Sequence, residues 1–175
     1  MRAARTIYTI GHSTRELDVF IEILAAYDIE ILADVRSMPR SNYTPQFNSD
    51  ALSKALKKCH ITYHHVPDLG GLRHTRKDSI NQGWRNLSFR GYADYMQSPD
   101  FERGLRQLLA LAVKPTAVMC AEAVPWRCHR SMIGDALLAR GQNVVDIFDK
   151  HKTQAETMTT FAKVSGTKIT YPAEE

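Results

Sequence analysis

The chain has 175 residues, of which 43% are hydrophobic and 24% are charged, and its formal net charge is +4. This length suits one well-buried domain spanning 1–175 and is too short for two domains of ordinary size. No apolar run approaches the ~20 residues that a membrane helix needs, and the apolar run 7–10 is too short for the core of a signal peptide. We therefore expect a cytoplasmic protein that does not contact a membrane.

The cysteines indicate the redox state of the thiols, and the arginines indicate the class of ligand. Three cysteines at irregular spacing, in a chain long enough to fold without crosslinks, favour reduced thiols over disulfides. Arginine supplies 14 of the 23 basic residues, and ten arginines lie from Arg36 to Arg130, interleaved with aromatic residues. The planar guanidinium group suits phosphate and carboxylate. The composition favours an anionic small molecule or nucleic acid as partner, although a solvated surface accounts for much of the same pattern.

The chain begins with a strand-like segment and a helix-like one. Residues 7–10 predict the first strand, which Gly11 and His12 break. Ser13 with Glu16 three residues later forms a capping box, which predicts that a helix starts here and ends near 27–28.

Three further elements follow in the first half. Residues 31–35 predict the second strand, and the polar loop 36–47 contains two prolines, so we expect it to be extended. A short helix is predicted over 48–58 and a third strand over 61–66.

The second half continues the alternation after a long polar stretch over 72–90 that favours no element. Ser98 and Pro99 open a helix as N-cap and first-turn proline. The remaining predicted elements are a strand over Thr116–Cys120, a helix from about 129 that ends at Gly141, a fifth strand over 144–148 and a sixth over 169–171.

Strands separated by helices are typical of right-handed crossovers and a parallel sheet covered on both faces. The chain has too few such units for a barrel of eight. We therefore predict an α/β fold: an open, mostly parallel sheet of five to six strands with helices on both faces, a three-layer sandwich.

Ligands of such folds bind outside the carboxyl ends of the strands, and here the residues after the strands are rich in His, Arg and Cys where plain turns show Asn, Asp, Gly and Pro. We therefore expect one functional site there. Four residues are catalytic candidates: His12, Cys120, Glu122 and Cys128. Eight are candidates for ligand binding: Gly11, Ser13, Arg36, Arg40, Gly70, Gly71, His129 and Arg130.

Several of these residues also have structural interpretations. His12 fits a histidine that bonds a backbone carbonyl at a tight turn, and Arg36 fits an ion pair with Asp34 or Glu122. Cys120 ends an apolar run, where a cysteine is usually part of the packing. The glycines at 70–71 fit a plain turn.

Cys128 lies at the start of a predicted helix. Free backbone N–H groups and the helix dipole attract anions there, and the same field would lower the pKa of Cys128 and make it a better nucleophile. Arg130 would then hold a phosphate or carboxylate with both arms of its guanidinium group.

Two familiar cysteine chemistries fit the spacing poorly. Cysteine-dependent phosphatases and sulfurtransferases place five residues between Cys and Arg, whereas six separate Cys120 from Arg127. A zinc site of Cys120, Cys128 and His129 with His12 lacks the usual short Cys-x-x-Cys hairpin. We therefore expect no metal, and the cofactor stays open.

Five motifs resemble the domain of unknown function 488 family of small prokaryotic proteins. In chain order they are Thr9-Ile10-Gly11-His12-Ser13, Asp34-Val35-Arg36-Ser37-Met38-Pro39-Arg40-Ser41, Pro45-Gln46-Phe47-Asn48, Leu69-Gly70-Gly71, and Cys120-Ala121-Glu122 continued by Pro125 and Cys128-His129-Arg130. The resemblance covers nearly the whole chain except 72–84 and the tail after Phe148. It implies an α/β domain with these residues at one site and implies no activity.

Two hypotheses of function follow. The first is an enzyme or enzyme-like protein, such as a hydrolase or transferase using Cys, His, Glu and Arg, with an anion-binding site for phosphate, nucleotide or nucleic acid. The alternative is a non-catalytic nucleic-acid-binding module that uses surface arginines such as Arg76, Arg85 and Arg90 together with aromatic residues.

Overall fold

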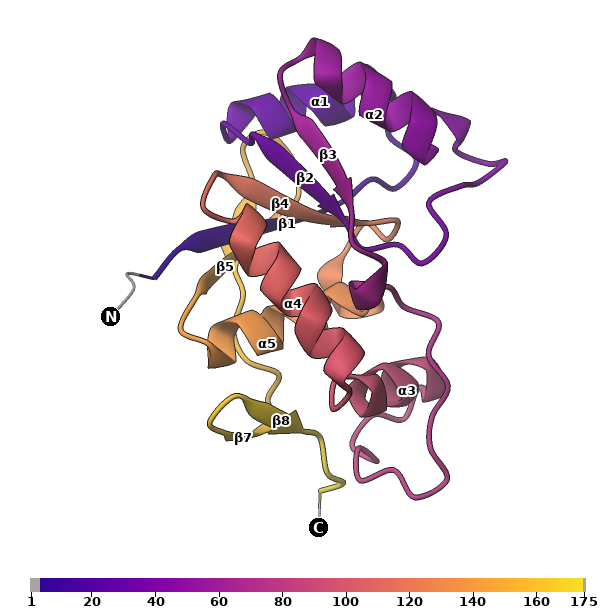
Figure 1. Ribbon diagram of the computed structural model, residues 1–175, viewed down its shortest axis with the longest axis vertical. Coiled ribbons are helices and arrows are strands. Elements are labelled where there is room, and N and C mark those ends of the chain that lie inside the picture. Colours follow the sequence, from indigo (N-terminus) through magenta and orange to yellow (C-terminus); the bar gives the residue numbers. More distant parts are fainter. Residues whose placement is uncertain (1–3, 175) are drawn as a thin grey trace.

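A computed structural model describes residues 4–174 and shows a six-stranded sheet between two layers of helices (Figure 1). The strand order is β3-β2-β4-β1-β5-β6, in which β6 alone runs antiparallel. The strands are β1 (Thr6–Gly11), β2 (Ile31–Asp34), β3 (Thr62–His65), β4 (Thr116–Cys120), β5 (Asn143–Ile147) and β6 (Thr153–Ala155). The helices are α1 (Leu17–Ala26), α2 (Ser49–Lys58), α3 (Leu87–Tyr95), α4 (Pro99–Leu111) and α5 (Arg130–Ala139). The predicted α/β fold is confirmed.

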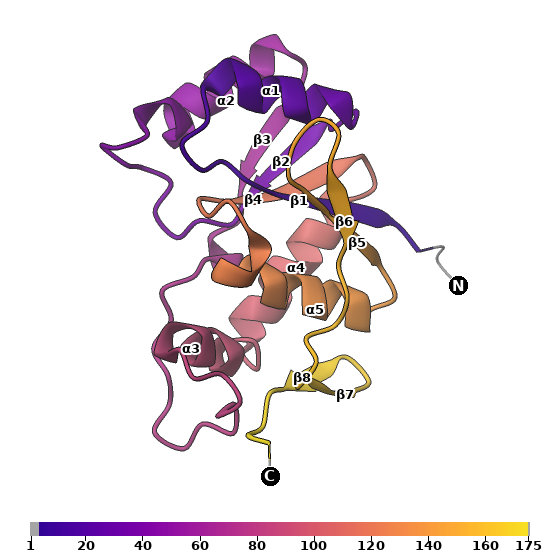
Figure 2. The same ribbon diagram turned by 180° about the vertical axis from the view of Figure 1, so that it is seen from behind.

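Two hydrophobic cores lie on opposite faces of the sheet. One forms where Phe20 of α1 and Leu56 of α2 pack with Met119 of β4. The other forms where Leu105 of α4 and further residues of α5 pack with Val118 of β4. Figures 1 and 2 show α1 and α2 on one side of the sheet and α4 and α5 on the other. The alternation of side chains along β4 therefore decides which residues face α5.

The sheet contains a point where neighbouring strands send their chains to opposite faces. β1 pairs with β4 in parallel, yet α1 follows β1 on one face and α5 follows β4 on the other. The two connections stay hydrogen-bonded as far as Ser13 and residue 121 and then diverge to opposite faces. Open α/β sheets bind their ligands at such switch points.

Several local signals in the sequence are confirmed, and one is wrong. Ser98 caps α4 by accepting a hydrogen bond from the N–H of Phe101, as its position predicts. The capping box at Ser13 does not form, because α1 begins at Leu17 and Glu16 makes no side-chain cap bond. Ser13 instead has a φ of 50° and donates its N–H to the carbonyl of residue 121, which prolongs the contact between β1 and the loop after β4.

The sixth strand also differs from the prediction. The segment predicted at 169–171 is largely β8 (Lys168–Thr170), which forms a separate hairpin with β7 (Lys163–Ser165) around Gly166 at a φ of +62°. The sixth strand of the main sheet is β6, whose three residues are all exposed and so carry no hydrophobic pattern. After the hairpin, the hydroxyl of Tyr171 donates to Asp135 of α5 at 2.7 Å.

The polar stretch after residue 72 is ordered by side-chain hydrogen bonds before α3 begins. Asp94 of α3 accepts bonds from Ser79 at 2.6 Å and from Asn81 at 2.8 Å. The single domain was predicted over 1–175, of which residues 1–3 and 175 lie outside the described part. Across the residues described, no helix has the length and apolar character needed to cross a membrane.

Candidate functional site

Two thiols lie together at the carboxyl end of β4. Val118 and Cys120 alternate with Met119, so the Cys120 side chain faces α5. Cys128 precedes α5 by two residues, and both thiols are buried, with 2% and 5% of their surface exposed. Both cysteines line a pocket of about 440 Å³. The strand and the helix thus bring two separated cysteines to the wall of one pocket.

Glycine at the end of β1 makes this approach possible. The loop after β4 passes so close to Gly11 that a Cβ there would lie 1.6 Å from the carbonyl oxygen of Glu122. The N–H of His12 donates to the carbonyl of Cys120 at 2.9 Å and continues the strand pairing. Gly11 and Ser13 therefore shape the backbone behind the pocket, and neither lines it.

The two thiols differ in acidity because each affects the other. Burial favours the protonated form of Cys120, but a hydrogen bond from Cys128, the positive charge of Arg130 and a bond from the Glu122 backbone outweigh it and lower the pKa of Cys120 to about 7. The hydrogen bond to Cys120, together with burial, raises the pKa of Cys128 well above its ordinary value. The sequence-based expectation that Cys128 has the lowered pKa is therefore wrong, and Cys120 is the more acidic thiol.

The buried Arg130 side chain lies behind Cys120 and is only partly satisfied. Its guanidinium group donates to Thr9 Oγ1 at 2.9 Å and to the Glu122 carbonyl at 3.1 Å. Its Nε is buried without a hydrogen-bond partner among residues 4–174, and no carboxylate there lies within ion-pair distance of it. A thiolate at Cys120 is thus an anionic partner that the site offers to this charge.

His129 lies beside Cys128 as a neutral ring. Its Nε2 donates to the carbonyl of Val35 at 3.0 Å, which leaves Nδ1 as an acceptor 3.4 Å from the Cys128 sulfur. Burial lowers the pKa of His129 to about 4. Gly71 makes room for this ring, since a Cβ there would lie 3.0 Å from Nδ1. His129 is therefore placed to accept a hydrogen bond from the Cys128 thiol.

A second buried arginine, Arg36, follows β2 and is fully engaged. It bonds Asp34 through Nε at 3.0 Å and Nη2 at 2.8 Å, and Nη2 also donates to the Phe47 carbonyl at 2.7 Å. Its Nη1 lies 3.3 Å from Nε2 of His12. Of the two partners proposed for Arg36 from the sequence, Asp34 is the one that it pairs with.

The structural interpretation of His12 fits its contacts. Its Nδ1 donates to the Ser13 carbonyl at 2.8 Å, and the ring stacks on Phe47 at 4.4 Å between centroids. Burial lowers the pKa of His12, which keeps the ring neutral. Nε2 then accepts from Arg36, so no free nitrogen remains for acid–base chemistry.

The pocket brings together only part of the predicted set. Six of the twelve predicted site residues line it: Arg36, Gly71, Cys120, Glu122, Cys128 and His129. Six lie outside its lining: Gly11, His12, Ser13, Arg40, Gly70 and Arg130. Arg40 is exposed on the loop after β2, and Gly70 packs against Ser37, whose hydroxyl a Cβ would approach to 2.5 Å. Arg127, absent from the predicted set, is exposed and lines the pocket.

The sequence analysis also did not predict that the N-terminal end of α3 lines the pocket. Asn86 caps α3 by accepting from the N–H groups of Ser88 and Phe89, and all three residues line the pocket. The N-terminal ends of α3 and α5 therefore both face it, and each carries partial positive charge. Asn-x-Ser before an ambiguous polar stretch is a weak cap signal, and it alone could have located this helix start.

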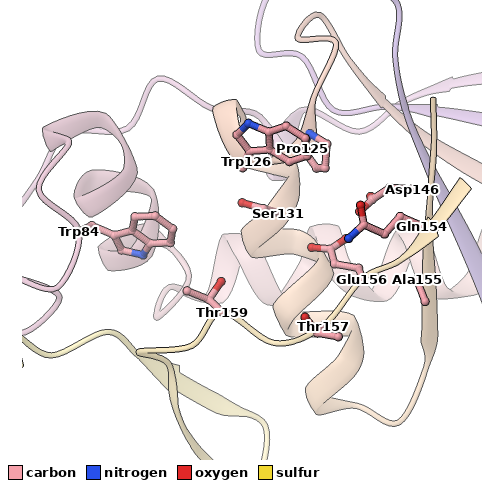
Figure 3. A pocket seen from close by; sticks show the side chains of 10 residues that line it. All are labelled: Trp84, Pro125, Trp126, Ser131, Asp146, Gln154, Ala155, Glu156, Thr157 and Thr159. Atoms are coloured by element: carbon pink, nitrogen blue, oxygen red, sulfur yellow. The ribbon is translucent and has the colours of Figure 1, made fainter.

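A second pocket, of about 330 Å³, lies on the other side of the first turns of α5 (Figure 3). Asp146 and Glu156 lie on one side of it and Trp84 on the opposite side, with Ser131 between them. Burial, followed by the charge of Asp146, raises the pKa of Glu156 to about 9, so Glu156 is protonated near neutral pH and hydrogen-bonds Asp146.

This carboxyl pair connects to the thiol pocket through one hydroxyl. Thr9 lies opposite Asp146 in the register of β1 and β5, and its hydroxyl donates to that carboxylate. The same hydroxyl accepts from Arg130. Asp146 and Thr9 therefore position the guanidinium group that faces Cys120, and neither was predicted as a site residue.

The cysteines and histidines do not assemble as the zinc hypothesis requires. Within the range 4–174, no group of three or more His, Cys, Asp or Glu side chains is arranged to hold a metal ion. The nitrogens of His12 are taken by Ser13 and Arg36, away from the thiols.

The matching family model, described as a domain of unknown function, DUF488, covers residues 16–137. The chain belongs to the DUF488 family. No curated protein and no solved structure matches the chain. The DUF488 match ends inside α5 and includes both thiols, His129 and Arg130, whereas Thr9 and Asp146 lie outside the matched residues.

Proposed function

We propose that this protein is a thiol-dependent transferase or hydrolase that acts on an anionic substrate in the pocket at the carboxyl ends of β2 and β4. The observation that supports it most is the buried guanidinium group of Arg130, which lowers the pKa of Cys120 to about 7 and has no carboxylate within ion-pair distance in the described range. A buried guanidinium group favours the thiolate, which is the nucleophilic form of cysteine.

The surroundings of Cys120 favour an anionic substrate. Arg127 lines the pocket, two helix N-termini face it and the buried Arg130 lies near it, against the single carboxylate of Glu122, whereas the charge of Arg36 is paired with Asp34. His129 adds no charge near neutral pH because its pKa is about 4. The lining thus carries an excess of positive charge toward a bound phosphate or carboxylate group.

The chemistry follows from these positions. The Cys120 thiolate attacks an electrophilic carbon or phosphorus of the substrate, and the leaving group departs with the electrons of the broken bond. Glu122, exposed at the pocket beside Cys120, supplies the proton to the leaving group or takes one from the attacking acceptor. Water as acceptor makes the protein a hydrolase, and another nucleophile makes it a transferase.

The nucleic-acid-binding alternative has less support. Arg76 pairs with Asp78 at 3.1 Å, and Arg90 donates to the Trp84 carbonyl at 3.0 Å, so two of the three arginines on which it relied are engaged locally. These contacts favour a small anionic ligand in the pocket over a strand laid across the surface.

Paired alkylating reagents test the proposal without knowledge of the substrate. Iodoacetate and iodoacetamide differ in charge, and Cys59, an exposed thiol at the end of α2, serves as the reference within the same chain. We expect iodoacetate to be favoured at Cys120 relative to Cys59, inorganic phosphate to protect Cys120, and Arg127→Met to reduce the preference. Peptide mass spectrometry measures each site. A Cys120 that is unreactive at pH 7.5, or that shows no preference for the anionic reagent, would contradict the proposal.

A further inference from the structure

The pair of thiols has a property that group transfer at a single nucleophile does not need. Cys120 and Cys128 are both buried, line one pocket at the junction of β4 and α5, and are close enough for each thiol to change the pKa of the other. Cys59, the third cysteine, is exposed at the end of α2. The two buried thiols are thus the pair that the fold brings into contact.

We propose that Cys120 and Cys128 form a reversible disulfide in reaction with a hydroperoxide, with Cys120 as the attacking thiol and Cys128 as the resolving thiol. This redox chemistry goes beyond the proposed group transfer and does not depend on it, because it needs the thiol pair and no anionic substrate.

The roles follow from what surrounds each sulfur. Arg130 supports negative charge on Cys120, and the N–H of Arg130 lies 3.4 Å from the sulfur of Cys128. Cys128 in turn has Nδ1 of His129 at 3.4 Å, held as an acceptor by the bond from Nε2 to Val35. One thiol therefore has a cation beside it and the other has a neutral hydrogen-bond acceptor, which separates the attacking role from the resolving role.

The first step oxidises Cys120. Its thiolate attacks one oxygen of the hydroperoxide, the O–O bond breaks, and hydroxide or alkoxide leaves, so that Cys120 becomes a sulfenic acid. Hydrogen peroxide is small enough to reach a thiol that is 2% exposed on the wall of a 440 Å³ pocket. The leaving hydroxide or alkoxide is neutralised by a proton from solvent, equivalent to the one that Cys120 released when it ionised.

The second step closes the disulfide. The Cys128 thiol, held by a hydrogen bond to Nδ1 of His129, attacks the Cys120 sulfur, so that the S–S bond forms, the S–O bond breaks and the Cys128 proton is released to the departing oxygen. The departing hydroxide takes that proton and leaves as water. In total two thiols are oxidised and one hydroperoxide is reduced, and a dithiol reductant reverses the change.

Disulfide formation also removes the thiolate beside Arg130. The buried guanidinium group then loses its anionic partner, while its Nε has none among the residues described. An oxidised form that is less well matched electrostatically is more easily reduced. We therefore expect dithiothreitol to restore both thiols readily.

The experiment uses the full chain carrying Cys59→Ser, which removes the exposed thiol and leaves the pocket unchanged. After treatment with hydrogen peroxide at pH 7.5, we expect the intact mass to fall by two hydrogens, both thiols to resist alkylation after unfolding, and dithiothreitol to reverse both changes. In the wild-type chain, Cys120 should be oxidised about tenfold faster than Cys59. Two free thiols after peroxide, or a sulfenic acid that persists at Cys120, would overturn the proposal.

Two variants assign the roles, with circular dichroism to confirm folding. In the Cys59→Ser background, Cys128→Ala should stop at a sulfenic acid that dimedone traps, and Cys120→Ala should slow the oxidation of Cys128 at least about tenfold. The opposite assignment would reverse the two results and overturn the proposed roles. The alkylation experiment above uses reduced protein without peroxide. A reactive Cys120 that shows no preference for the anionic reagent therefore rejects anionic group transfer alone, whereas a missing mass change rejects the disulfide alone.

Discussion

Two buried arginines follow neighbouring strands of the same sheet, and their surroundings differ in one decisive way. Arg36 follows β2 and bonds the buried Asp34, the Phe47 carbonyl and His12, so that its charge and all its N–H directions are used. Arg130 follows β4, where hydroxyl and carbonyl oxygens take two of its donors and a thiol lies in place of a carboxylate. The first arginine therefore stabilises the fold, and the second is available to act on a neighbouring group.

The largest expected effect on stability concerns Arg36, the arginine that is paired with Asp34. Arg36→Met leaves the fully buried Asp34 without its cation, and breaking a buried ion pair costs about 3–5 kcal/mol. We expect the free energy of unfolding at pH 7, measured by urea denaturation, to fall by about that amount. Arg127→Met, at an exposed position, is the matched control and should change it little. Equal stability of the two variants would remove the distinction between the two arginines.

The second prediction concerns the arginine beside the thiol. Arg130→Met removes the positive charge that lowers the pKa of Cys120 to about 7, so the thiolate forms at higher pH. The midpoint of the pH dependence of Cys120 alkylation should rise by about one to three pH units. Cys59 alkylation in the same sample is the control and should not move. An unchanged midpoint at Cys120 would assign the acidity to Cys128 instead.

The carboxyl pair gives a third prediction, with a sign that can be checked. Glu156 has a pKa raised to about 9, so its contribution to stability is complete below its ordinary pKa near 4.5 and is lost as pH rises toward 9. Between these values the stability falls by up to about 1.4 kcal/mol per pH unit. Glu156→Gln should flatten this slope in urea denaturation at pH 5, 7 and 8.5. A wild-type protein that gains stability over this range would contradict the assignment.

The smallest expected effect is at Gly71. A methyl group there would lie 3.0 Å from Nδ1 of His129, so Gly71→Ala shifts the ring that accepts the hydrogen bond from Cys128 and holds this thiol for its attack. We expect a loss of about 1 kcal/mol in stability and slower closure of the disulfide, with dimedone trapping more sulfenic acid. The rate of the first oxidation at Cys120 should be unchanged, since Arg130 stays in place. A change in the first step alone would show that His129 acts on Cys120.

The fold class and the location of the pocket can be predicted from the sequence. Alternating strand and helix segments predict the α/β class and its three layers, and the clustering of Cys, His and Arg after the strands predicts where a pocket lies. The residues at which helices begin and end can also be predicted from the sequence: Ser98 caps α4, and Gly141 follows α5 with a positive φ. These features depend on local pattern and on a general rule of parallel sheets, and both are visible in one chain.

Other features depend on contacts between distant residues. Ser13 and Glu16 have the spacing of a capping box, but the backbone of Ser13 is held by the loop after β4, which no local pattern reveals. The assignment of the lower pKa to Cys128 followed from its helix start, whereas the thiol pair and Arg130 decide the order of acidity. Thr9 and Asp146 join the site only through the pairing of β1 with β5.

That pairing has a consequence for how the protein divides into parts. The segment that defines the family, 16–137, contains the reactive side chains, but the hydroxyl and carboxylate that orient Arg130 come from strands on either side of it in sequence. Farther along the chain, the hydroxyl groups of Tyr171 and Thr159 both donate hydrogen bonds to Asp135, which lies on the helix that begins at Arg130. The smallest fragment that keeps Arg130 oriented is therefore longer than the segment 16–137 that the family model matches. A truncation to 16–137 would keep the cysteines but would free the guanidinium group of Arg130, whose charge lowers the pKa of Cys120.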